Sequence, residues 1–358
     1  MLSLASGCRS ASTPQRKVDT SLTRFASSGH EAFAEGDLDV AIAQYRKALH
    51  RAWSIDDPYE SGTSAYNLAA CMTSLSKNQE ARDWLVDARV ELCRAKSSAG
   101  NTWLLEAKIA QQECRFEEAK TFVDRAACSQ PPCDAGSGDC LCGPKDPCKE
   151  SCVMRIPCVG SRVKQKKAAE QCEDDYTAQI HLARARLAAE TYEIECAEMH
   201  FACACELAAD VCSESLQAEL QNVAAMIHLA KGEYLQAAWH FDNEAKHLRL
   251  AGNYREIPVA LELASAAYEQ AERADLAASR MCRVARIWFG RGEFKKSWSY
   301  LPQALCLAEH CRCQSAKIRL ALLAKEIELA LADQGEPMLP KPPKDSLLLD
   351  NSENLESS

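Results

Sequence analysis

Glycine and proline are scarce in this sequence, and aromatic residues make up only 6% of it. The chain has 14 glycines and 13 prolines among 358 residues, and alanine, leucine, glutamate, glutamine and arginine are frequent. Because helix-breaking residues and β-branched runs are few, the composition favours helix over strand almost throughout. We therefore expect an all-α protein without a sheet.

Long apolar runs and excess positive charge are missing as well. No stretch of 18 or more apolar residues occurs, so the sequence predicts no membrane-spanning helix. The net charge of −9 argues against a nucleic-acid partner, because binding to phosphate backbones depends on clustered Lys and Arg. With 47% hydrophobic residues, the chain can still bury an extended core.

The usual signatures of catalysis do not occur either. The eight histidines are scattered without metal-ligand spacing, and the sequence has no glycine-rich phosphate loop and no Gly-x-Ser-x-Gly. His200 and His240 each precede a phenylalanine that closes a predicted hairpin, so we interpret them as partly buried structural residues. The sequence predicts that the protein is not an enzyme.

What the sequence does contain is an internal repeat of small residues. Steps of seven, twelve and nineteen from Gly29 lead to Gly36, Ala41 and Ala48, and the same steps recur from Ala69, Ala107, Ala185 and Ala225. Two antiparallel helices that cross closely need small residues at the contact, while large residues fill the space between hairpins. Glu244, at the last step of the fifth repeat, breaks the small-residue rule.

This pattern resembles the tetratricopeptide repeat (TPR). The matching residues are Phe25, Gly29, Gly36, Leu38, Ala41, Tyr45, Ala48 and Leu49, and Trp103 takes the opening aromatic position of a later repeat. The resemblance implies a right-handed superhelical solenoid of TPR-like helical hairpins, with hairpins 1–3 in residues 22–128 and hairpins 4–7 in residues 173–332. Gly36 and Gly232 lie at tight turns that favour a positive φ.

Beyond residue 251 the register is ambiguous. If the repeat steps are counted from Ala266, they lead to Ala278 and Ala285. If they are counted from Ala285, they define a different hairpin, and Ala285 cannot belong to both hairpins. We expect four further helices, near 256–271, 274–290, 294–309 and 313–331, and leave their pairing open. The proline-rich and polar tail, residues 333–358, is expected to be disordered.

A cysteine-rich irregular insert, residues 129–172, interrupts the repeats. Eight thiols lie in or beside it: Cys128, Cys133, Cys140, Cys142, Cys148, Cys152, Cys158 and Cys172. Because few apolar residues remain to form a core, the insert needs disulfides or a metal to be ordered. Zinc on Cys140, Cys142, Cys148 and Cys152 is the alternative to disulfides, although their spacing is not the usual Cys-x₂-Cys, and a reduced loop is the third interpretation. We expect no other cofactor.

The first residues resemble the end of a bacterial lipoprotein signal. Leu4, Ala5, Ser6 and Gly7 precede Cys8, the residue that would be lipidated, and residues 1–21 would then be a signal remnant and tether. Ala5 stands where leucine is usual, and no charged or long apolar region precedes it. A chance cysteine in a frayed terminus is the alternative. The expected location is a bacterial cell envelope through a lipid anchor, with the cytoplasm as alternative.

The TPR resemblance also implies a binding surface on the first helix of each hairpin. The residues expected there are His30, Phe33, Tyr66, Asn67, Thr73, Gln179, Arg186, Asn222 and Met226. Our leading hypothesis is a non-catalytic scaffold that binds other proteins or peptides and meets a membrane only through a lipid anchor. The alternative is a zinc-binding or thiol-redox protein acting through the cysteine-rich insert.

Overall fold

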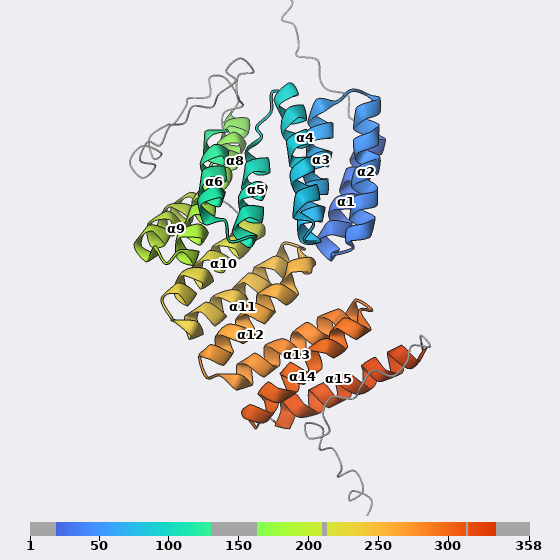
Figure 1. The fold of residues 1–358 in the computed structure, drawn as a ribbon, viewed down its shortest axis with the longest axis vertical. Coiled ribbons are helices and arrows are strands. Elements are labelled where there is room, and N and C mark those ends of the chain that lie inside the picture. Colours follow the sequence, from blue (N-terminus) through green and yellow to red (C-terminus); the bar gives the residue numbers. More distant parts are fainter. Residues whose placement is uncertain (1–18, 130–162, 210–212, 313, 334–358) are drawn as a thin grey trace, which may run out of the picture. The chain divides into compact units, whose positions relative to one another are not determined.

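The computed structural model describes residues 19–129, 163–209, 213–312 and 314–333, with side chains in the helix that begins at Val163 described from Asp175 on. Every regular element in these ranges is a helix (Figure 1). The chain forms two compact units. Of the described residues, the first comprises 19–33 and 37–97, and the second comprises 34–36 and those from Ser98 on.

The first unit is built from four helices: α1 (Thr20–Glu35), α2 (Leu38–Ser54), α3 (Pro58–Ser74) and α4 (Asn78–Arg94). Local sequence explains where they start, because the side chain of Asp37 caps α2 and that of Asp57 caps α3, where Pro58 occupies the first turn. Gly29 of α1 lies against the ring of Tyr45, so that a Cβ would approach the ring to 2.8 Å.

The second unit contains the remaining helices: α5 (Gly100–Gln112), α6 (Phe116–Cys128), α8 (Val163–Glu190), α9 (Ile194–Ala208), α10 (Glu214–Ala230), α11 (Tyr234–Leu250), a 3-10 turn η1 (Tyr254–Glu256), α12 (Ile257–Gln270), α13 (Ala274–Gly290), α14 (Phe294–His310) and α15 (Gln314–Asp333). Helices that follow one another pack as pairs, α5 with α6, α8 with α9 and α10 with α11. The four helices expected after residue 251 are confirmed.

The small residues of the repeat occupy the helix contacts that the sequence predicts. The alanines at the twelfth step are fully buried in all five hairpins: Ala41, Ala81, Ala119, Ala197 and Ala237. The residues at the seventh step all adopt a positive φ, between 58° and 97°: Gly36, Ser76, Cys114, Tyr192 and Gly232. The fold is thus an all-α array of TPR-like helical hairpins.

The structure also resolves the pairing after residue 251, because α13 packs against both α12 and α14. The Ser265 hydroxyl donates to the carbonyl of Ala277 (3.0 Å), and the Ser297 hydroxyl donates to the carbonyl of Ala285 (2.7 Å). Helix α13 therefore crosses α12 at one contact and α14 at another. The anchor predicted at Ala266 is wrong by one residue, since Ala266 is exposed and the buried Ser265 takes its place.

The predicted insert ends earlier than expected, because α8 begins at Val163 rather than after residue 172. Lysine, glutamine and alanine dominate its first turns, and these residues favour helix. Cys128, at the end of α6, forms no disulfide with another cysteine of the described ranges. The other seven predicted thiols, the lipidation site Cys8 and the tail after Asp333 lie outside the residues whose side chains are described. In the described ranges no helix is long and apolar enough to cross a membrane.

Candidate functional site

The predicted binding residues of the first unit differ in their access to solvent. His30 on α1 is exposed, whereas Phe33 on the same helix and Tyr66 and Asn67 on α3 are half-buried. Thr73 is only 7% exposed, and its hydroxyl donates to the carbonyl of Ala69 at 2.9 Å within α3. The Thr73 side chain therefore offers little surface to a partner.

In the second unit, two of the four predicted residues touch each other. The Arg186 guanidinium on α8 donates to the Asn222 side-chain oxygen on α10 at 3.1 Å. Gln179 bonds instead within its own helix, to Asp175 at 3.2 Å, and Met226 packs against the hydrophobic core. Arg186 and Asn222 therefore mark the place where a polar site can be built from neighbouring hairpins.

The contact between Arg186 and Asn222 belongs to a larger network. The Asn222 amide donates to Glu244 on α11 at 3.0 Å, and Gln111 on α5 donates to Glu190 on α8 at 2.6 Å. Glu219, one turn before Asn222 on α10, interacts electrostatically with both Arg186 and Glu244. We call these side chains the polar network: Gln111, Arg186, Glu190, Asn222, Glu219 and Glu244. It joins four helices of the second unit.

Neighbouring cations and hydrogen-bond donors only partly stabilise the negative charge of the carboxylates in the polar network. Burial raises the pKa of Glu244 to about 7, although the Asn222 amide and Arg186 act in the opposite direction. Burial raises the pKa of Glu190 as well. The pKa of Glu219 is also raised by desolvation of its carboxylate, although the residue as a whole is exposed. A cation brought by a partner would stabilise the charged form of all three.

The sequence analysis named Arg186 and Asn222 as binding residues, but it did not name the carboxylates around them. A signal for Glu244 existed, because this residue breaks the small-residue rule of the repeat. A charged side chain at a position that is otherwise fully buried needs a reason, and the hydrogen bond from Asn222 supplies one. Gln111, Glu190 and Glu219 carry no comparable signal, since Glu and Gln are common on exposed helix faces.

A histidine pair lies elsewhere in the same unit, with His181 Nδ1 and His200 Nδ1 3.1 Å apart. Both residues are 6% exposed, so His200, predicted to be partly buried, is buried. Burial lowers both pKa values, that of His200 to about 4, so the pair is neutral near pH 7. In the part of the chain that the structure describes, no three His, Cys, Asp or Glu side chains are placed to hold a metal ion.

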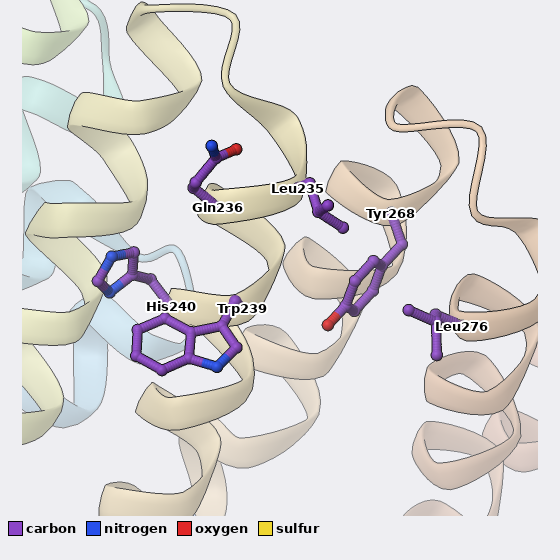
Figure 2. Close-up of a pocket in the computed structure, with 6 residues that line it drawn as sticks. All are labelled: Leu235, Gln236, Trp239, His240, Tyr268 and Leu276. Carbon is purple, nitrogen blue, oxygen red and sulfur yellow. The ribbon is translucent and has the colours of Figure 1, made fainter.

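An open pocket of about 450 Å³ lies on α11, α12 and α13. Its lining residues are Leu235, Gln236, Trp239 and His240 of α11, Tyr268 of α12 and Leu276 of α13 (Figure 2). Leu235 and Trp239 are 48% and 58% exposed, whereas Tyr268 is 5% exposed and forms a fixed part of the wall. The sequence analysis did not identify this pocket, because its residues come from three helices without a shared motif.

The repeats and their hairpin contacts define a TPR-like array. The chain is similar to a tetratricopeptide repeat protein from Parabacteroides merdae, with 13% identity and a TM-score of 0.37 over 92% of this chain and 98% of that one. It is also similar to the TPR domain of P58(IPK), with 15% identity and a TM-score of 0.27 over 88% and 84%. No protein-family model and no curated protein matches the sequence.

Proposed function

We propose that this protein is a non-catalytic scaffold that holds a segment of another protein against the polar network of its second unit. The observation that carries the proposal is the series of hydrogen bonds that links α5 to α8 and α8 through α10 to α11. Helical hairpins bring these side chains together from distant parts of the sequence. Such a surface recognises a partner by charge and hydrogen bonding, and it needs no bond-making step.

The charge balance favours a basic segment as the ligand. Four carboxylates act on one another here, Asp175, Glu219, Glu244 and Glu256, and a fifth, Glu190, is attracted by the same Arg186. Three cations lie among them, Lys108, Arg186 and Arg255, and Arg255 is paired with Glu256 at 2.7 Å. A lysine or arginine of a partner would supply the missing positive charge, and its attraction would be strongest at low ionic strength.

Arg186 adds a second kind of recognition. Its Nη2 is engaged by Asn222, but its buried Nε has no hydrogen-bond partner among the described residues. A buried donor without an acceptor costs free energy, which a carbonyl or carboxylate oxygen of a bound segment would recover. An unpaired donor together with excess carboxylate suits an extended peptide, which offers a backbone oxygen together with basic side chains.

Fluorescence anisotropy with two labelled peptides of equal length and apolar content, one lysine-rich and one glutamate-rich, tests this proposal. We expect the lysine-rich peptide to bind and the glutamate-rich peptide not to bind. The double change Glu219→Gln and Glu244→Gln should weaken binding by about tenfold or more. Glu80→Gln, on α4 of the first unit, removes an exposed carboxylate of the same size and is the matched control.

Equal binding of both peptides, or equal losses in the control and the double variant, would mean that attraction to the polar network is not specific. In that case the network would be a structural feature of the array. Circular dichroism of each variant ensures that a loss of binding is not a loss of helix.

The proposed location is a bacterial cell envelope, with a lipid on Cys8 as the anchor. Its support is the Leu4–Cys8 resemblance and the polar residues that follow it, which suit a tether between a membrane and a folded domain. The scaffold would then hold its partner close to the membrane surface.

A further inference from the structure

The α11–α13 pocket places an exposed aromatic side chain beside a rigid wall. Trp239 is 58% exposed and meets the His240 ring edge-on at 4.8 Å, which fixes one side of the indole. Tyr268 is held by its hydroxyl, which donates to Asp242 at 2.9 Å, and by the Arg280 guanidinium 4.9 Å from its ring centroid. An apolar side chain entering the pocket would therefore meet surfaces that are already in position.

A cluster of cations lies one helical turn beyond the pocket. Asp242 follows Trp239 by three residues and Arg280 follows Leu276 by four, and the Arg280 guanidinium donates to the Asp242 carboxylate at 3.0 Å. Arg283 Nη1 is also 3.9 Å from Asp242, and Arg249 lies close enough to act on Arg283 electrostatically. Two guanidiniums thus face one carboxylate, and a third lies near one of them.

Arg283 is a partly exposed member of this cluster of cations. Its side chain is 51% exposed, and its pKa is lowered by burial of part of the side chain and by repulsion from Arg280 and Arg249, against the attraction of Asp242. The surface therefore fits a ligand with aliphatic side chains followed, about one or two helical turns later, by carboxylates. Its charge is opposite to that of the polar network.

One segment of this chain has that composition. Residues 345–356 read Asp-Ser-Leu-Leu-Leu-Asp-Asn-Ser-Glu-Asn-Leu-Glu, which places three consecutive leucines directly before Asp350 and Glu353. The segment has four carboxylates and no cation. It lies outside the described residues, which end at Asp333 of α15.

The tether between α15 and the leucines is long enough to reach the pocket. Leu347 follows Asp333 by fourteen positions, a distance along the chain that spans up to about 46 Å when extended. Helix α15 packs against α13, one of the helices that form the pocket, and α13 is only about 26 Å long. Leu331 of α15 even belongs to the same core cluster as Tyr268.

We propose that residues 345–356 dock on the α11–α13 pocket of the same chain, with the leucines against Trp239 and Tyr268 and with Asp350 and Glu353 against Arg280 and Arg283. The docked segment covers the exposed indole and supplies the missing negative charge. Because the segment is tethered, its effective concentration is in the millimolar range, and even weak intrinsic affinity keeps the pocket occupied. An aliphatic and acidic segment of another protein would have to displace it.

A peptide added in trans tests the docking. A labelled peptide of residues 345–356 is titrated into the full chain and into a full-length variant in which Leu347, Leu348 and Leu349 are serine. We expect the variant to bind the peptide about tenfold more tightly than the parent, because its own tail no longer competes. Within the variant, Trp239→Ala should weaken binding by about tenfold, whereas Trp53→Ala, a 50% exposed tryptophan of the first unit, should not.

A charge-reversal experiment and a cross-linking experiment test where the segment docks. Arg283→Glu should abolish binding of the natural peptide and restore binding of a peptide in which Asp350 and Glu353 are lysine. A photo-reactive residue at position 348 of the full chain should cross-link to α11 or α13 of the same molecule. Cross-links to the exposed Leu322 face of α15 or to a second copy would overturn the proposal, as would equal peptide affinity in parent and variant.

Discussion

Glu244→Gln should stabilise the second unit, and the gain should depend on pH. Glu244 is the one position where the repeat has a charged residue instead of a small one, and burial raises its pKa from the ordinary 4.5 to about 7. Glutamine has nearly the same shape and keeps an acceptor for the Asn222 amide. The substitution therefore removes the charge while leaving the hydrogen bond in place.

The sign of the effect follows from proton linkage. The unfolded chain ionises Glu244 as the pH rises above about 4.5, whereas the folded chain resists ionisation until about pH 7. The folded state therefore loses stability across this interval, by at most about 3 kcal/mol, since one pKa unit corresponds to about 1.4 kcal/mol. Glu244→Gln should match the parent near pH 4.5 and be more stable at pH 8.

Thermal unfolding followed by circular dichroism at pH 5, 6, 7 and 8, in the presence of a reductant, measures this difference. Glu80→Gln, an exposed change in the first unit, should show no such trend. If Glu244→Gln lowers the melting temperature at pH 8, the carboxylate is well satisfied and the reasoning is wrong. An equal gain at pH 5 and pH 8 would show that ionisation is not the cause.

Four further changes test other parts of the account. Ala237→Leu should destabilise by about 1 to 3 kcal/mol, because the alanine is fully buried at a helix crossing; a neutral result in chemical denaturation would mean that the hairpin register is wrong. Gly62→Ala should lower the melting temperature, since the new Cβ would lie 2.7 Å from a leucine of α4, whereas Gly290→Ala, with nothing within 4 Å, should not. His200→Gln should reduce the loss of stability as the pH falls from about 6.5 to 4, because the folded state holds His200 neutral down to about pH 4; an unchanged acid transition would contradict this. Cys8→Ser should prevent the native protein from partitioning into detergent, and mass spectrometry that finds an unmodified Cys8 would refute lipid anchoring.

The hairpin array could be predicted from the sequence because its determinants are local and periodic. Small residues at fixed steps specify where two helices cross, and the structure buries them as predicted. The turn positions show how weak a single-residue signal is. Glycine at positions 36 and 232 predicts a positive φ. Tyr192 also adopts a positive φ, 59°, at the equivalent step, and this turn can be located only from the repeat spacing and not from the residue type.

The polar network could be predicted only in part. Periodicity places Arg186 and Asn222 on the first helices of successive hairpins, so their proximity follows from the register. The pairing of Gln111 with Glu190 spans the cysteine-rich insert, and no sequence rule relates the two. The pocket on α11, α12 and α13 depends equally on how neighbouring hairpins stack, which fixes the distance between Trp239 and Tyr268 without leaving a motif.

The most direct test of the proposed scaffold is a double-mutant cycle between Glu219 and one lysine of the lysine-rich peptide. Four dissociation constants are measured by anisotropy, for the parent and Glu219→Gln chains with the parent peptide and with a peptide in which that lysine is glutamine. If the two charges meet in the complex, the losses are not additive, and a coupling of about 1 kcal/mol or more is predicted for at least one lysine position. Additive losses at every lysine position would contradict the claim that the polar network binds the segment.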